Sequence, residues 1–438
     1  MRRYLVFCVL VFCVLVFLAW SSPVQAEHFT GPGGLRVYLL ESHANPMVEV
    51  RLLSRGGAVH DPPGKEGVAA ISAWMFNEGS QALSSSDFHE RLAFHGIHLD
   101  ATANMESLQV NLTSRSEHLE EAWAGLADLL LRPRLDERDF LRAVSEQKAS
   151  IIKAQEQPQT VASLRMHRLL FPNHPYGAPV SGTLEGLAKV TLADVRRRHA
   201  EAWHAPDLVL AVAGDVTRAQ LEGLLRRHLA GLDATPSPLP PVAAVSVSAG
   251  EQARQQHIAM ELPQTTIMLA ALGIKRQDPD YYTLYVLNQI LGGAGLTSRL
   301  SLEIREKRGL TYGVYSRFSP FSETGPFVVV MKTKTASRQE ALTLLGQELQ
   351  KMADHGVSEE ELQEAVQYLT GSFPLYLDGL GKLASIWGTI GFYQLGDDYL
   401  QQWPQRIRAV SRVDILRVAK RILDPARFFT VTVGQATP

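Results

Sequence analysis

Residues 291–316, LGGAGLTSRLSLEIREKRGLTYGVYS, decide how the chain is interpreted. Within this stretch Leu296, Leu300 and Ile304 recur every four positions, a spacing that predicts an amphipathic helix. Gly309 stands where a left-handed cap would end that helix. The stretch is therefore predicted to contain a helix that turns at a single glycine.

A strand is predicted to follow the glycine, with Tyr312, Val314 and Ser316 on one side of it. The helix, the turn and the strand together bring Arg305 and Tyr312 toward the same surface. Two simpler interpretations stay open: Arg305 faces the negative end of the helix dipole, and Tyr312 belongs to the strand core. A phosphate loop is disfavoured because no Walker lysine follows the glycines and the helix lies on the wrong side of them.

The segment SRLSLEIREKRGLTYGVYS resembles the C-terminal signature of the M16 (pitrilysin/insulinase) metallopeptidases, in particular their short-chain, processing-peptidase-like branch. In that family an arginine and a tyrosine at this spacing reach across a closed chamber to the substrate. The matching residues here are Arg305 and Tyr312. The resemblance implies that these two side chains bind substrate. Whether the chain can itself cleave a substrate depends on whether its N-terminal half carries the family's zinc site.

The composition is ordinary for a soluble globular protein. Of the 438 residues, 45% are hydrophobic and 20% are charged, and a chain of this length is too long for one core. The net charge of −2 gives no support to nucleic acid or an anionic membrane as a partner. Two or more domains are therefore expected.

Residues 1–26 are predicted to be a secretory signal peptide. Two arginines precede an apolar run from Tyr4 to Trp20, and the segment ends in small residues at Ala26. A retained membrane anchor is the alternative, although the run is near the lower limit for spanning a bilayer. Cys8 and Cys13 both lie in this run, so a mature chain has neither a disulfide nor a thiolate metal site. We expect such a chain in a bacterial periplasm, with no membrane contact after cleavage.

The N-terminal half is predicted to lack the family's zinc site. In active members a helix carries His-x-x-Glu-His, whose histidines hold zinc while the glutamate activates the zinc-bound water. Residues 67–80, GVAAISAWMFNEGS, match that helix, but its three motif positions are Ala70, Ala73 and Trp74. The family's further glutamate ligand falls on Ser150. Alanine offers no lone pair and the indole only donates, so this chain is expected to hold no metal.

A metal site elsewhere has little support. His89, His95 and His98 form the densest histidine cluster, but Gly96 is predicted to end the helix between them. We interpret them as solvated or structural, with a ligand role as the alternative. The next segment is predicted to be a strand that continues to Leu112, and in the family this strand is the edge on which peptide substrates lie.

The order of elements recurs after a proline-rich boundary. Residues 233–250 are predicted to link an N-terminal domain (27–232) to a C-terminal domain (251–438) that carries the Arg/Tyr pair. Residues 174–183, HPYGAPVSGT, are nearly a verbatim family motif with a structural role. Residues 119–131 are predicted to form an amphipathic helix with Trp123 and Leu126 on its buried side. Residues 375–399 are predicted to be a core helix rather than the wall of a peptide groove. The implied fold is α+β: two homologous domains, each a mixed sheet with helices mainly on one face.

The leading hypothesis is a zinc-less subunit of a heterodimeric M16 peptidase that degrades or processes peptides. A zinc-bearing M16 partner would supply the catalytic site, and this chain would supply Arg305 and Tyr312 as donors to the oxyanion. The competing hypothesis is a pseudopeptidase that keeps the fold as an interaction scaffold. A homodimer that hydrolyses peptides with other metal ligands is a third hypothesis, but it lacks a ligand cluster.

Overall fold

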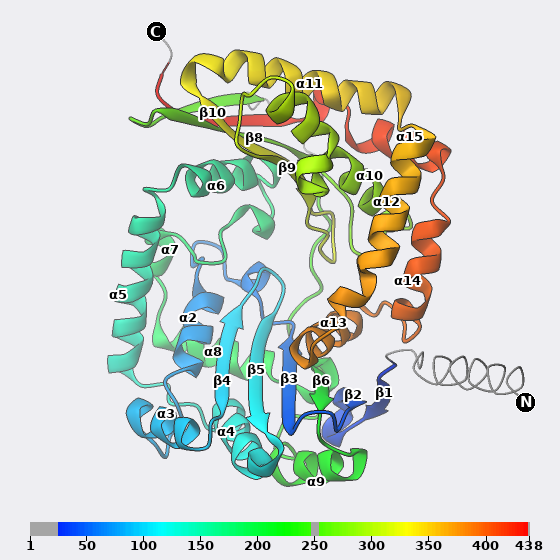
Figure 1. Cartoon of the computed structure of the whole chain (residues 1–438). Coiled ribbons are helices and arrows are strands. Elements are labelled where there is room, and N and C mark those ends of the chain that lie inside the picture. Colours follow the sequence, from blue (N-terminus) through cyan, green and yellow to red (C-terminus); the bar gives the residue numbers. More distant parts are fainter. Residues whose placement is uncertain (1–24, 247–253, 437–438) are drawn as a thin grey trace, which may run out of the picture.

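The computed structural model shows two mixed β-sheets, one above the other in Figure 1, with helices around both. It describes residues 25–246 and 254–436. Residues 1–24 of the predicted signal peptide, which include both cysteines, and residues 247–250 of the predicted linker lie outside the described residues. Within the described ranges, no helix is both long and apolar enough to cross a membrane.

The N-terminal sheet has six strands in the order β1-β2-β6-β3-β5-β4. They are β1 (Glu27–Thr30), β2 (Arg36–Glu41), β3 (Met47–Ser54), β4 (His98–Ala103), β5 (Leu108–Arg115) and β6 (Val209–Gly214). The β2–β6 pair is parallel and the other pairs are antiparallel, so the sheet is mixed, as predicted. Strand β4 lies at one edge.

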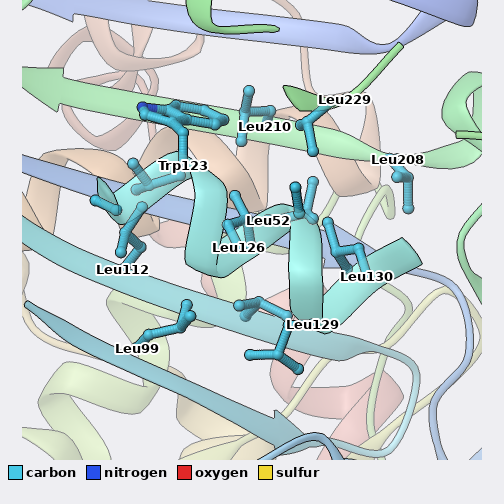
Figure 2. Packing of buried hydrophobic residues seen from close by; sticks show 14 of the residues in the cluster. Leu52, Leu99, Leu112, Trp123, Leu126, Leu129, Leu130, Leu208, Leu210 and Leu229 are labelled. Atoms are coloured by element: carbon cyan, nitrogen blue, oxygen red, sulfur yellow. The ribbon is translucent and has the colours of Figure 1, made fainter. Parts of the chain in front are cut away.

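One face of this sheet carries the main N-terminal core. Helix α4 (Leu119–Leu131) runs across it and has the predicted bounds. Its Trp123 and Leu126 are fully buried and pack with Leu52 of β3 and Leu112 of β5 (Figure 2). Burying each such side chain contributes about 1.5–3 kcal/mol, so the amphipathic pattern of this helix was enough to place it.

The described part of the N-terminal half contains seven further α-helices. They are α2 (Val68–Phe76), α3 (Ser85–Phe94), α5 (Glu137–Ala154), α6 (Pro158–Leu170), α7 (Leu184–Leu187), α8 (Leu192–Ala202) and α9 (Arg218–His228). Both α8 and α9 begin at capping boxes, in which a threonine hydroxyl and the side chain three residues later satisfy two free amides of the first turn. These caps set where each helix starts.

The C-terminal sheet has five strands in the order β7-β11-β8-β10-β9. They are β7 (Gln255–Ala259), β8 (Gln264–Leu272), β9 (Val314–Phe318), β10 (Pro326–Lys334) and β11 (Phe429–Gly434). The helices of this half are α10 (Tyr281–Asn288), α11 (Arg338–His355), α12 (Glu359–Ser372), α13 (Leu380–Tyr393), α14 (Tyr399–Arg408) and α15 (Arg412–Ile422). The β11–β7 pair is parallel and the other neighbours are antiparallel, so this sheet is also mixed.

Helix α13 crosses to the other half of the molecule. The prediction of a core helix in residues 375–399 is confirmed, but α13 packs on β6 and β3 of the N-terminal sheet. Trp387 is buried there, and a Cβ atom at Gly391 would lie 2.5 Å from ring and methyl carbons of Tyr38 and Val209. Only glycine allows the helix to approach the sheet this closely.

Helix α6 makes the reciprocal crossing. It belongs to the N-terminal half, yet it covers β8 and β11 of the C-terminal sheet. Ala162 and Met166 of α6 are fully buried against Met268 and Val431. Each sheet thus has its second face covered by one helix from the opposite half, which fastens the two halves together.

A buried carboxylate adds a polar connection between the halves. The strand predicted to continue to Leu112 is instead a hairpin of β4 and β5, because the chain turns back at residues 104–107. Glu106 in this turn is 5% exposed and accepts hydrogen bonds from the hydroxyls of Tyr176 (2.6 Å) and Tyr393 (2.8 Å) and from the Ser322 amide (3.0 Å). Two of these donors come from the C-terminal half, so Glu106 joins both halves.

Candidate functional site

The helix before Gly309 is shorter than predicted. A 3₁₀ turn at Gly295–Thr297 precedes it, and its last part is a π-helical turn, Ser301–Glu306. Leu300 and Ile304 are fully buried as expected, but Leu296 is 60% exposed, so its predicted place on the buried face was wrong. The backbone is extended at the residue after the 3₁₀ turn, and this break separates Leu296 from the helix.

Gly309 ends the helix as predicted. Its φ of 62° lies in the left-handed region, and its amide donates to the Arg305 carbonyl oxygen at 2.9 Å. The Leu310 amide then donates to the Ile304 carbonyl oxygen at 3.1 Å. These two bonds fold the chain sharply back, so the residues after the glycine leave from the C-terminal end of the helix.

Tyr312 lies before the strand rather than in it. Strand β9 begins at Val314, and the Tyr312 side chain is 93% exposed. The Thr311 hydroxyl hydrogen-bonds the carbonyl oxygens of Gly313 (2.8 Å) and Lys332 (2.7 Å), an arrangement that replaces regular strand pairing here. Both the predicted strand position of Tyr312 and its alternative role in the strand core were therefore wrong.

The Arg305 side chain is also accessible. It is 32% exposed and pairs with the carboxylate of its neighbour Glu306. Lys307 pairs with Glu303, while Arg308 is exposed and makes no ion pair with any residue that the structure describes. An exposed pair such as Arg305–Glu306 is weak, on the order of 0–1 kcal/mol, so the guanidinium is available to another anion.

The helix that matches the family's zinc helix is firmly anchored. The Asp61 carboxylate accepts hydrogen bonds from the amides of Gly67 (2.7 Å) and Ala69 (2.9 Å) at the start of α2. Burial raises the pKa of Asp61 to about 6, although the Arg198 guanidinium and both amides act in the opposite direction. The framework of the helix is thus intact at the point where the zinc ligands would begin.

The motif positions themselves hold no metal-ligating group. Ala70, Ala73 and Trp74 lie on α2, which packs against α5. Ala73 is buried, Ala70 and Trp74 are partly exposed, and Ser150 on α5 is exposed. Across residues 25–246 and 254–436, no group of three or more His, Cys, Asp or Glu side chains could hold a metal ion.

An arginine stands beside the tryptophan that replaces the second motif histidine. The Arg142 guanidinium lies 5.0 Å from the centre of the Trp74 ring and pairs with the carboxylates of Glu78 and Asp139. A cation against the face of an indole is a favourable contact. This part of α2 and α5 is therefore joined by an ion-pair network, which could not be predicted from the sequence because Arg142 is 68 positions away from Trp74.

The three clustered histidines turn to different partners. The His89 ring hydrogen-bonds the Asn77 carbonyl oxygen at 2.7 Å, and the His98 ring lies 3.1 Å from the Asp100 carboxylate. The His95 ring packs against the His118 ring. The structural interpretation therefore fits each of them.

The comparisons with known proteins decide the family. Residues 36–184 match the family model "Insulinase (Peptidase family M16)", and residues 189–369 match "Peptidase M16 inactive domain". The chain belongs to the M16 peptidase family. Together the two matches cover most of both sheets and include the segment with Arg305 and Tyr312.

Individual M16 relatives support the same assignment. A non-peptidase homologue, YmxG, of Helicobacter pylori is 26% identical over 81% of each chain. The crystal structure of a peptidase M16 inactive domain from Pseudomonas fluorescens has a TM-score of 0.88 and 28% identity, and the match covers 94% of this chain and 98% of that one. The periplasmic protease PqqL from Escherichia coli shares the fold, with a TM-score of 0.77 and 17% identity over 94% of this chain but 46% of its own.

In this M16 chain the outer edge of β4 is occupied by a side chain. The Asn77 amide nitrogen donates to the Ala101 carbonyl oxygen (3.1 Å), and the Ala101 amide donates to the Asn77 side-chain oxygen (2.8 Å). Asn77 therefore imitates one peptide unit of a neighbouring strand. This role of Asn77 was not predicted from the sequence, where the available signal was an asparagine directly after the last turn of α2.

Proposed function

We propose that this chain is the zinc-less subunit of a heterodimeric periplasmic M16 metallopeptidase that degrades or processes peptides. In this proposal Arg305 and Tyr312 act on the substrate in the partner's zinc site. The observation that carries it is the exposure of Tyr312, which is 93%. The Tyr312 ring is not part of the core and the Arg305 side chain, seven residues earlier, is also accessible, so both can contact a ligand; tyrosine, with an apolar ring and a polar hydroxyl, is enriched at binding surfaces.

The chemistry of peptide hydrolysis explains the pair. The zinc in the partner would activate the attacking water. Attack on the scissile carbonyl develops negative charge on its oxygen, and preorganised donors at that oxygen stabilise the transition state. In this role the Tyr312 hydroxyl donates one hydrogen bond, and the Arg305 guanidinium supplies further donors together with a positive charge.

Two features support a site that is completed by another chain. The edge of β4 is filled at Ala101 by Asn77, so a peptide strand cannot pair there while that contact persists. The shared fold also covers only 46% of PqqL, so a protein with this fold can be about twice as long as the present chain. A second M16 chain would provide the open strand edge and the zinc ligands that this chain does not provide.

The scaffold hypothesis is the second candidate. It is favoured by the Trp74–Arg142 network, in which the residue at a zinc-ligand position of the family contacts another side chain of this chain. It gives no reason for Tyr312 to be exposed. The two proposals therefore differ in whether catalysis depends on the C-terminal half of this chain.

Reconstitution tests the proposal. The mature chain and the M16 chain of the same cell that carries His-x-x-Glu-His are purified separately and then mixed. Zinc content and turnover of an unfolded peptide are measured for each chain and for the mixture. We expect substoichiometric zinc and no turnover for this chain alone, and a zinc-bearing, active complex after mixing. A tightly held zinc that is removed from this chain together with its own activity would contradict the proposal, and so would an inactive complex.

A further inference from the structure

A cavity near the segment that carries Arg305 and Tyr312 is lined by two positively charged residues and otherwise by uncharged ones. It has a volume of about 410 Å³ and lies between the first turns of α6 and the face of the C-terminal sheet that α6 partly covers. Arg317 of β9 and Lys332 of β10 line it, together with uncharged residues that include Gln159 and Ser163. No aspartate or glutamate is among its lining residues.

Both cations are free to bind an anion. Arg317 and Lys332 are exposed, and neither side chain makes a hydrogen bond or ion pair with any residue in the described ranges. Alternation along the strands puts them on the same face of the sheet: Arg317 lies opposite Val328, and Lys332 is four residues further along β10. Both residues line the same cavity, so an anion in it is attracted by two positive charges.

The cavity lies next to the segment that carries Tyr312. The Thr311 hydroxyl bonds the backbone carbonyl of Lys332 at 2.7 Å, and the Gln159 amide donates to the Tyr315 hydroxyl at 2.9 Å. The first of these bonds ties the strand of Lys332 to the residue before Tyr312. The second ties the start of α6 to β9. A peptide that reaches Tyr312 would therefore pass close to both cations.

We propose that Arg317 and Lys332 form a subsite for a carboxylate of the bound peptide. This inference rests on the proposed function, because that function is what brings a peptide to this surface. The carboxylate comes either from an aspartate or glutamate side chain or from the peptide C-terminus. Gln159 and Ser163 add neutral hydrogen-bonding groups around it. The subsite makes the chain selective for acidic peptides.

Peptide binding to the mature chain alone tests the subsite without the partner or zinc. The probes are fluorescein-labelled twelve-residue peptides of Gly, Ala, Ser and Leu. One has a free C-terminus, one is amidated, and an amidated set carries a single Asp moved along the sequence, matched with Asn. At low salt we expect the best carboxylate probe to bind about tenfold more tightly than its neutral match, from two exposed ionic contacts. The preference should disappear in high salt, where screening is strong.

Two double variants separate the subsite from general charge. Arg317→Gln with Lys332→Gln should reduce the preference to less than about twofold, because both ionic contacts are removed. Arg408→Gln with Lys420→Gln removes the same charge from exposed positions on α14 and α15 and should leave the preference unchanged. A preference only for the free C-terminus assigns the carboxylate to the terminus, and a preference for Asp assigns it to a side chain.

The proposal is overturned by equal affinities in all arms, including binding too weak to detect in every arm. It is equally overturned by a preference that both double variants weaken alike. A failure here differs from a failure of the proposed function. In the first case the mixed complex hydrolyses peptides without acidic selectivity; in the second it has no activity at all.

Discussion

The two halves of the molecule are built alike but use their polar groups in opposite ways. In the N-terminal half, the groups on and beside the helix that matches the family's zinc helix contact other residues of this chain: Arg142 pairs with Glu78 and Asp139 beside Trp74, and Asn77 occupies the edge of β4 at Ala101. In the C-terminal half, Arg305 is partly exposed and Tyr312 is 93% exposed. The proposed function rests on this difference between contacts made within the chain in one half and accessible side chains in the other.

Glu106 is a buried polar link between the halves, and of the substitutions proposed for this chain its loss should have the largest effect on stability. Glu106→Ala leaves the hydroxyls of Tyr176 and Tyr393 and the Ser322 amide without their acceptor in a buried site. Removing one partner from a buried network costs about 3 kcal/mol. Urea unfolding at neutral pH, followed separately in each half, measures the loss and shows whether the halves begin to unfold independently.

A matched control makes this result interpretable. Glu90 on α3 is exposed, and Glu90→Ala removes the same group without a buried partner, so we expect a change within about 0.5 kcal/mol. An equally small loss for Glu106→Ala would show that the helix exchange of α6 and α13 alone holds the halves together.

Removing the side chain that occupies the edge of β4 should lower the stability less than Glu106→Ala does. Asn77→Ala removes both hydrogen bonds to Ala101, and we expect a loss of about 1 kcal/mol. Hydrogen exchange at the Ala101 amide should become much faster, because that amide faces solvent in the variant. The Leu112 amide on neighbouring β5 serves as the internal reference and should keep its rate. Unchanged protection of Ala101 would show that this edge is not held by Asn77.

Local patterns in the sequence predicted the local structure well. The apolar repeat gave helix α4 its bounds, and the position of Gly309 gave the left-handed cap, because each depends on residues within a few positions. Tyr312 was misplaced because the Thr311 hydroxyl bonds a carbonyl of β10, about twenty residues away. The spacing of apolar residues along the sequence gives no information about such a contact.

The contacts between the halves could not be predicted from the sequence for the same reason. Which sheet α13 covers depends on the close approach of Gly391 to Tyr38, more than 350 residues earlier in the chain. Glu106 looked like an ordinary turn residue because its three donors come from distant segments. Arg305 and Tyr312 could be predicted because their segment resembles a family motif. Asn77 and Arg142 could not, because their roles depend on residues that are distant in the sequence and close only in the folded chain.

Turnover by the mixed complex with Tyr312→Phe tests the central claim most directly. The substitution removes one hydroxyl from a side chain that is 93% exposed, so folding and assembly should be unchanged. We expect turnover to fall on the order of a hundredfold, the usual effect of losing one oxyanion donor, and Arg305→Ala to lose at least as much. Arg308→Ala, three residues from Arg305, should stay near the wild-type rate. Full activity of an assembled Tyr312→Phe complex would contradict the claim and favour the scaffold.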